Sequence, residues 1–238
     1  MKNKFLHVSN VRRVIEAVTA LRGQAAGLPC LAAWHGPAGR GKTETSIWYA
    51  GNHDALYMIP QVNSSQLDLL NDLYAALKGQ KEAKFHRRRD AFGACLRLMW
   101  NRSAPVLIDE ADRISKHTAL VETVRDLSDR TGCPVIFVGT DQMLVHLMQR
   151  EQIASRLAEV VEFKPLSVDE VVMATNELCG LELNQDAAQV LHRRTQGFFR
   201  DLVVALSHIE RTARANKLSD LPAEMVDKTS RLAIKRAA

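Results

Sequence analysis

Short, almost wholly apolar runs alternate with longer amphipathic stretches through the first two thirds of this 238-residue chain. The apolar runs are typical of strands that are buried on both faces, and they lie at 28–34, 55–59, 105–108, 134–140 and 160–163. Between them, apolar residues recur with helical spacing at 11–21, 65–77, 88–100 and 117–130, the first of these capped by Ser9 or Asn10. Strands that alternate with helices in this way predict an α/β fold with a parallel sheet covered by helices on both faces.

The pattern changes after Pro165. From Ser167 onward the apolar residues have helical spacing only, which predicts a small helical lid behind the α/β domain. We therefore expect an α/β domain over residues 1–165, with an N-terminal linker helix at 9–24, and a helical lid with a basic C-terminal segment over 166–238.

A phosphate-binding loop of the form G-x-x-x-x-G-K-[ST] lies between the first predicted strand and the helix that follows it. It consists of Gly36, Pro37, Ala38, Gly39, Arg40, Gly41, Lys42 and Thr43, with Glu44 next to it. Backbone N–H groups of such a loop wrap a triphosphate, and the helix N-terminus adds partial positive charge. Lys42 would reach the β- and γ-phosphates, and the Thr43 hydroxyl would take one Mg²⁺ position. The sequence predicts ATP and Mg²⁺ as cofactors.

Two carboxylates follow the third apolar run, which ends Val106-Leu107-Ile108-Asp109-Glu110. This is the form of a Walker B element, in which Asp109 holds Mg²⁺ and Glu110 polarises the water that attacks the γ-phosphate. An acidic pair after a strand can also serve only to cap the next helix. A phosphate loop upstream favours the catalytic interpretation, and the adjacent glutamate favours hydrolysis over the chemistry of a small-molecule kinase.

The order of these motifs resembles that of the AAA+ ATPases over nearly the whole chain. The resemblance implies that Thr140, after the next strand, is a sensor 1 residue near the γ-phosphate. It implies that Arg156 is an arginine finger that reaches a neighbouring subunit's nucleotide, with Arg150 as the alternative. It also implies that Arg200 is a sensor 2 residue that contacts the phosphates of its own subunit. A single arginine on a helix surface is more often only a solvated charge, but the order of these motifs favours the functional roles of Arg156 and Arg200.

Within that superfamily the chain is most similar to transposition ATPases of the phage Mu B, TnsC and TniB type. Its compact size, its simple lid and the helix that begins Asn10-Val11-Arg12-Arg13 carry this resemblance. Such proteins assemble on target DNA as homo-oligomeric rings or helical filaments, and they recruit and activate a transposase. The Mu protein has an N-terminal helix-turn-helix domain, whereas about thirty residues precede the first strand here. We therefore expect the ATPase domain itself to bind DNA.

Clustered positive charge supports a nucleic-acid partner. The formal net charge is +5, and Arg87, Arg88 and Arg89 form a basic run. Lys228, Arg231 and Lys235 recur on one face of the last predicted helix. Basic stripes of this kind suit the phosphates of double-stranded DNA, although solvated faces without a partner are nearly as common.

Composition points to the cytoplasm. The four cysteines form no CxxC pair, so they are typical of small buried hydrophobic residues in a reducing compartment. No stretch approaches 18 uncharged apolar residues, so we expect no membrane segment.

Three functions remain open from the sequence. The leading hypothesis is a sequence-nonspecific, ATP-dependent DNA-binding ATPase that serves DNA transposition. The second is a replication-type AAA+ initiator or helicase loader with another DNA-processing partner. The third is a regulator in which ATP switches a protein-interaction surface and no DNA is bound.

Overall fold

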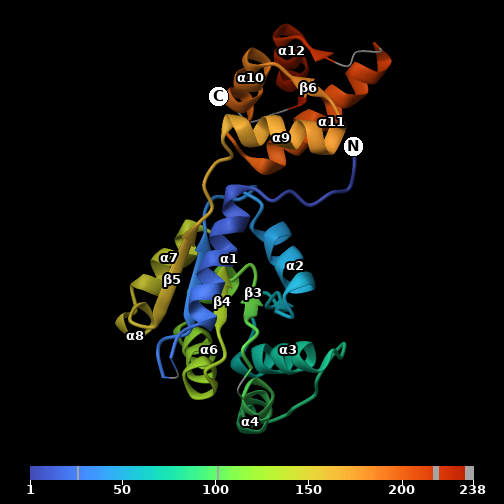
Figure 1. The fold of residues 1–238 in the computed structure, drawn as a ribbon. Coiled ribbons are helices and arrows are strands. Elements are labelled where there is room, and N and C mark those ends of the chain that lie inside the picture. Colours follow the sequence, from blue (N-terminus) through green and yellow to red (C-terminus); the bar gives the residue numbers. More distant parts are fainter. Residues whose placement is uncertain (26, 101, 217–219, 234–238) are drawn as a thin grey trace. The chain divides into compact units, whose positions relative to one another are not determined.

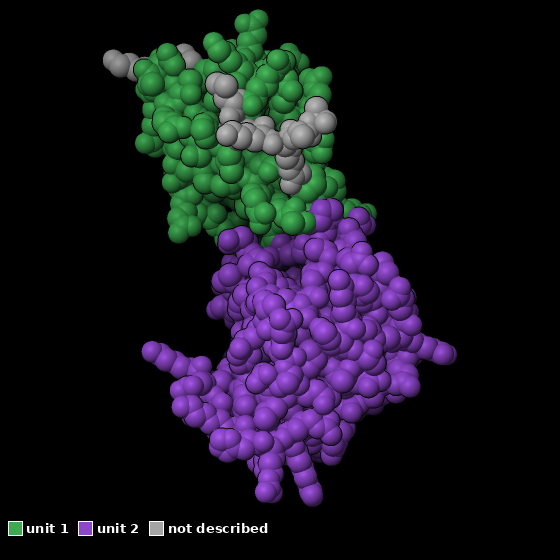
Figure 2. All heavy atoms as spheres, turned by 180° about the vertical axis from the view of Figure 1, so that it is seen from behind, with its two compact units in different colours: residues 1–12, 38–41, 164–238 green, residues 13–37, 42–163 purple. Residues whose placement is uncertain are grey.

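The computed structural model describes residues 1–25, 27–100, 102–216 and 220–233, and the chain divides into two compact units. The first, here called the core unit, consists of Arg13–Pro37 and Lys42–Phe163. The second, the helical unit, consists of Met1–Arg12, Ala38–Gly41 and Lys164–Ala238. Figure 2 draws the core unit in purple and the helical unit in green.

A five-stranded parallel sheet forms the centre of the core unit (Figure 1). Its strands are β1 (Leu31–His35), β2 (Leu56–Met58), β3 (Val106–Ile108), β4 (Val135–Val138) and β5 (Leu157–Glu162). The strand order is β2-β3-β4-β1-β5, and every neighbouring pair is parallel. The predicted α/β fold class is confirmed.

Helices cover both faces of this sheet because successive side chains of each strand point to opposite sides. In β1, Leu31 and Ala33 join one buried cluster while Ala32 and Trp34 join the other. The second cluster includes residues of α1 (Ser9–Arg22) and α2 (Lys42–Asn52). The first includes residues of α3 (Gln66–Lys78), α4 (Arg88–Met99), α5 (Asp112–Ser115), α6 (Thr118–Thr131), α7 (Asp141–Met148) and α8 (Glu151–Ala154). No helix among the described residues is long and apolar enough to cross a membrane.

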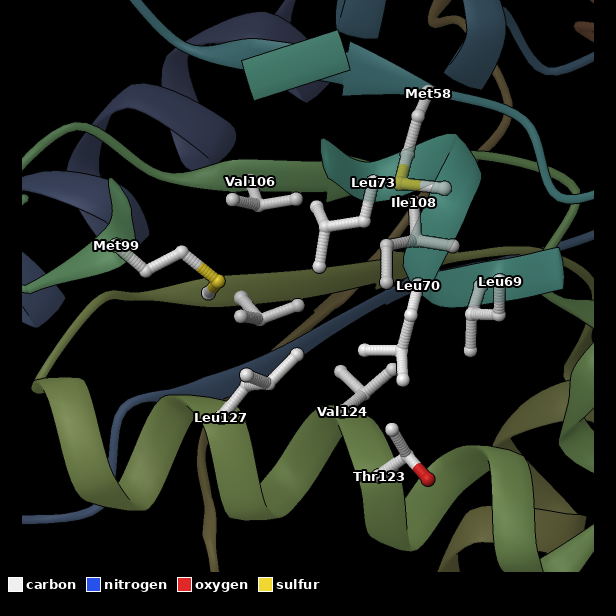
Figure 3. Close-up of a pocket in the computed structure, with 11 residues that line it drawn as sticks. Met58, Leu69, Leu70, Leu73, Met99, Val106, Ile108, Thr123, Val124 and Leu127 are labelled. Carbon is white, nitrogen blue, oxygen red and sulfur yellow. The ribbon is translucent and has the colours of Figure 1, made fainter. Parts of the chain in front are cut away.

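The apolar cluster between α3, α6 and the sheet is closely packed. Figure 3 shows Leu70 and Leu73 of α3 near Ile108 of β3, with Val124 and Leu127 of α6 below them. The cavity that these side chains enclose measures about 10 Å³ and is lined by apolar side chains with Thr123 at its edge. A space of this size barely holds one water molecule, so this part of the core unit is structural and is not a ligand site.

The helical unit contains four helices among its described residues: α9 (Val168–Cys179), α10 (Gln185–Thr195), α11 (Phe199–Ala215) and α12 (Ala223–Ala233). A capping box at Ser167 starts α9, and Gly180 ends it in the left-handed conformation. The prediction of helices only beyond Ser167 is wrong, because β6 (Glu182–Leu183) and β7 (Asp220–Leu221) pair as a small parallel sheet. Each of these strands has only two residues, too few to give a period in the sequence.

Two predicted boundaries are also wrong. The first strand begins at Leu31 rather than Leu28, since Leu28 is 51% exposed and Pro29 has no N–H to donate to a neighbouring strand. Asn10 lies inside α1 and does not cap it. Its side-chain amide instead donates to Lys164 O and accepts from Lys164 N, both at 2.9 Å, so it fixes the segment after β5.

Candidate nucleotide-binding and hydrolysis site

The phosphate-binding loop leaves the carboxyl end of β1 and runs into the first turn of α2. Gly36 and Gly41 have φ of 142° and 90°, which L side chains rarely adopt. Lys42 Nζ donates to Gly36 O at 2.6 Å and to Pro37 O at 3.0 Å, so the ammonium curls back over the loop. Thr43 is exposed beside it. The loop therefore presents a cation, a hydroxyl and a helix N-terminus together, as a bound phosphate requires.

The tip of the loop, Ala38–Gly41, belongs to the helical unit. Within that unit, Arg200 N donates to Gly39 O at 3.0 Å, and the Arg40 guanidinium lies 3.9 Å from the centre of the Phe198 ring. The first turn of α11 thus packs against the loop tip. The Arg200 side chain is exposed, and its predicted contact with phosphate stays a prediction.

Asp109 directly follows the strand β3, and the residue is only 3% exposed. Its Oδ1 accepts from Glu110 N at 2.8 Å, and its Oδ2 accepts from the Tyr57 hydroxyl at 3.0 Å. Burial and the carboxylates of Asp109, Glu110 and Glu44 raise the pKa of Tyr57, so it stays a neutral donor. Tyr57 was not predicted as a site residue, because a tyrosine in a short apolar run is typical of packing alone.

Glu110 has an unusual backbone. Its φ of 50° is in the left-handed region, which is rare for a residue with a side chain and is often found at functional sites. The Glu110 side chain is 49% exposed, and its carboxylate forms an ion pair with Arg113. Arg113 also donates to Pro60 O at 2.9 Å, two residues after β2. While this ion pair is formed, the Arg113 guanidinium partly neutralises the negative charge of the Glu110 carboxylate.

Thr140 follows β4 and is the N-cap residue of α7, but its side chain does not cap that helix. Its hydroxyl hydrogen-bonds Asp112, whose other carboxylate oxygen accepts from Thr140 N at 2.9 Å. The close approach requires a glycine before Thr140, because a Cβ on Gly139 would lie 2.6 Å from Asp112 Oδ2. To donate to a phosphate, the Thr140 hydroxyl would have to exchange its bond to Asp112.

The topology explains why most of these residues share one edge of the core unit. β3, β4 and β1 are neighbours and parallel, so their carboxyl ends meet at the same edge. Lys42, Thr43, Asp109, Glu110 and Thr140 all follow those ends. Among the described residues, no three His, Cys, Asp or Glu side chains could together hold a metal ion. The donors present, one buried carboxylate and one hydroxyl, suit Mg²⁺ that a nucleotide also holds.

Arg156 lies at the other end of the sheet, where the strands β1 and β5 begin. It precedes β5, and Leu31 N donates to Arg156 O at 3.2 Å at the start of β1. The five residues of β1 separate it from the phosphate-binding loop by about 16 Å, too far for its own side chain to span. The guanidinium pairs with Asp129 at 3.1 Å and borders a pocket of about 620 Å³ that Arg22, Arg102 and Arg130 also line.

The Arg150 side chain is fixed by hydrogen bonds to other residues of its own chain. Its guanidinium donates to Thr118 Oγ1 and to the backbone oxygens of Ser115, Lys116 and His146, at 2.6–3.0 Å. Those bonds satisfy carbonyls at the ends of α5 and α7. These bonds hold the Arg150 side chain against its own chain, which favours Arg156 of the two candidates for an arginine finger.

The basic residues fall into two groups. Arg87, Arg88 and Arg89 are exposed at the N-terminus of α4, in the core unit. Lys228 and Arg231 lie on α12 in the helical unit, where Arg231 pairs with Asp227 at 2.8 Å. Lys235 lies outside the described residues.

Comparisons with a protein family and with solved structures agree with this fold. A family model described as "AAA domain" matches residues 30–148, half of the chain. The fold is similar to that of Aeropyrum pernix ORC2, with 16% identity and a TM-score of 0.66 over 100% of this chain and 72% of that one. Pyrobaculum aerophilum Cdc6p is 15% identical, with a TM-score of 0.68 over 100% of this chain and 70% of that one. The Thermotoga maritima RuvB Holliday junction branch migration motor is 19% identical, with a TM-score of 0.63 over 94% of this chain and 68% of that one. No curated protein matches the sequence significantly.

Proposed function

Because this chain belongs to the AAA domain family, we propose that it is an ATP-dependent, largely sequence-nonspecific DNA-binding ATPase. In this proposal it assembles on target DNA and recruits or activates a transposase, and ATP hydrolysis limits the lifetime of the assembly. The observation that carries the DNA-binding part is an exposed basic segment beside the α/β core.

In this proposal, four residues at the loop edge of the sheet take part in hydrolysis: Lys42, Thr43, Asp109 and Glu110. Lys42 and the loop N–H groups would hold the β- and γ-phosphates, while Asp109 and Thr43 would hold Mg²⁺. The bound Mg²⁺ would neutralise charge that develops on the phosphate oxygens. Glu110 accepts the proton of a water whose oxygen bonds to the γ-phosphorus. The bond from that phosphorus to the β–γ bridging oxygen breaks, and ADP and phosphate leave.

The basic segment spans residues 78–90, between the end of α3 and the first turn of α4. It contains Lys78, Lys81, Lys84, Arg87, Arg88 and Arg89 against two acidic residues, and all six cations are exposed. Asn71 fixes the segment through two hydrogen bonds with the Phe85 backbone, at 3.0 and 3.2 Å. The charges are therefore presented by an ordered turn.

Helix stability does not account for the three arginines. Cations at a helix N-terminus oppose the helix dipole, and Arg87, the N-cap of α4, makes no capping hydrogen bond with its side chain. An anion at the same place would be favoured by both the arginines and the N–H groups of the first turn. DNA phosphates fit this description, and a basic segment without a groove-reading module favours binding to any sequence.

The C-terminal basic face is the weaker candidate for DNA contact. Asp227 pairs with both Arg194 and Arg231. The hydrogen bond from Arg194 is the main cause that lowers the pKa of Asp227, and Arg231 lowers it further. The aspartate thus neutralises part of the charge on α12. Lys228 remains exposed there.

Assembly follows from the position proposed for Arg156. An arginine that cannot reach its own loop can act on ATP only in a neighbouring copy, so we expect a ring or helical filament. The RuvB structure to which this fold is similar is named as a Holliday junction branch migration motor, and this name supports a function on DNA. A replication-type initiator or helicase loader would use the same residues with a different protein partner, and an adjacent transposase gene would distinguish the two.

Replacing Arg87, Arg88 and Arg89 with alanine tests the DNA surface. We expect weaker binding to unrelated duplexes by similar factors, because bonds to phosphates carry no sequence information. The slope of log affinity against log salt should also become shallower by about 0.9 for each phosphate that the variant no longer neutralises. Fluorescence anisotropy with two unrelated duplexes at several salt concentrations measures both quantities.

The matched control is the triple replacement of Lys228 and Arg231 together with Arg193, which removes equal charge from the helical unit. It should change affinity and slope less than the first triple variant does. Wild-type affinity and slope in the Arg87–Arg89 variant would remove this surface from the proposal. A strong preference for one duplex would contradict nonspecific binding.

A further inference from the structure

The pocket of about 620 Å³ lies at the end of the core unit's sheet where β1 and β5 begin, whereas the phosphate-binding loop follows the other end of β1. All of the residues that line it belong to the core unit. Its volume lies within the range of about 300–1,000 Å³ that is usual for small-molecule sites. The reaction proposed above involves one lining residue, Arg156, and gives the cavity itself no role.

Positive charge dominates the wall of this pocket. Four arginines from four separate segments line it: Arg22 at the end of α1, Arg102 after α4, Arg130 in α6 and Arg156 before β5. Among the described residues that line the pocket, Asp129 is the one acidic residue, and it pairs with Arg156 at 3.1 Å. The wall therefore carries a net charge of +3, which a bound anion would offset.

Helix ends explain only half of this charge. Arg22 and Arg130 lie in the last turns of α1 and α6, where the helix dipole favours a cation. Arg102 and Arg156 lie outside any helix, so no dipole accounts for them.

Two buried polar atoms of the wall also lack partners. Arg102 donates to Asp54 O at 2.7 Å, but its Nε is buried and has no hydrogen-bond partner in the described part of the chain. The same is true of Gln24 Oε1. Such orphaned groups are rare, because each loses its bonds to water. A ligand with both an acceptor, such as a phosphate oxygen, and a donor, such as a hydroxyl, would satisfy the two once these side chains turn toward it.

Apolar side chains form another part of the wall. They are Leu21, Leu28, Pro29 and Pro134, and Leu28 is 51% exposed. Guanidinium groups bind phosphates through paired N–H groups, and apolar side chains suit the remainder of an organic molecule. We propose that this pocket binds a small phosphorylated organic molecule at a second anion site, separate from the ATP site. This binding requires neither ATP nor DNA, so it stands apart from the proposed function.

The test compares phenyl phosphate with inorganic phosphate, which carries the same anionic group without an apolar part. The full chain with Lys42→Ala, which weakens the ATP site, is titrated by NMR at concentrations where sedimentation shows single copies. Phenyl phosphate should bind about 10-fold more tightly than inorganic phosphate because its ring is buried. Adding Arg22→Gln and Arg130→Gln should weaken its binding about 10-fold or more, since bonds to a charged group are lost. The control adds Arg12→Gln and Arg193→Gln, which remove equal charge from exposed positions outside the pocket, and should match the Lys42→Ala parent.

Ser103→Glu provides a second variant if the double glutamine variant does not fold. It keeps all four arginines but adds a carboxylate at an exposed position of the wall, so it should also weaken binding of phenyl phosphate. Unchanged affinity in the folded pocket variants would overturn the site. Equal affinity for the two probes would mean an adventitious ion only and would overturn it as well. Binding that occurs only where the protein assembles would assign these arginines to a neighbouring copy's ATP instead.

Discussion

Replacement of Glu110 by glutamine is expected to lower ATP turnover about 10²- to 10⁴-fold, the usual contribution of a general base. Glutamine keeps the size of the side chain but cannot accept a proton. ATP binding should persist, because Lys42, Thr43 and Asp109 are unchanged. Since hydrolysis then no longer ends the bound state, complexes with DNA should last longer than those of the wild type. Phosphate release and the dissociation rate from labelled duplex measure the two effects.

Glu16→Gln, on the exposed side of α1, is the control for the loss of one carboxylate. It should leave turnover and dissociation unchanged. Normal hydrolysis by Glu110→Gln would mean that another group accepts the proton. A loss of ATP binding in that variant would mean that Glu110 serves the nucleotide or its metal, and not the water.

Replacement of Arg156 by alanine is expected to remove the acceleration that assembly gives. In-trans arginines contribute roughly 10³–10⁵ in rate in GTPase systems, so the assembled protein should lose most of its activity. Specific activity of the wild type should rise with protein concentration and with DNA, and Arg156→Ala should flatten both rises. Steady-state turnover over a wide range of concentrations measures this.

Variants of two other arginines distinguish the possible reasons for such a loss of activity. Arg12→Ala removes an exposed arginine of α1 and should keep the concentration dependence. Arg150→Ala should lower thermal stability, because it leaves the carbonyls of Ser115, Lys116 and His146 without their donor. Turnover by the wild type that does not depend on concentration would contradict a site shared between subunits.

The parts of this protein that follow from regular spacing could be predicted from the sequence. Strands buried on both faces leave continuous apolar runs, so these runs alone were enough to indicate the parallel sheet. The phosphate-binding loop and the Asp109-Glu110 pair come directly after such runs, which placed them at one edge of the sheet. The two-residue strands of the helical unit are too short to leave any period.

The contacts among polar side chains could not be predicted in the same way. Tyr57 reaches Asp109 from 52 residues away, and Asp112 reaches Thr140 from 28 residues away. Such pairs depend on which strands become neighbours, and no local pattern encodes that choice. Arg113 is close to Glu110 in the sequence, but its second contact, with Pro60, exists only because β2 and β3 pair.

The proposed function requires that bound ATP controls attachment to DNA. Its most direct test is the affinity of wild type and of Lys42→Ala for nonspecific duplex with ATP, with ADP and with no nucleotide. Wild type should bind tightly only with ATP, and Lys42→Ala should bind weakly in all three conditions because its loop lacks the ammonium that offsets phosphate charge. Equal affinity of the wild type in the three conditions, or ATP-dependent binding by Lys42→Ala, would contradict control of DNA binding by ATP.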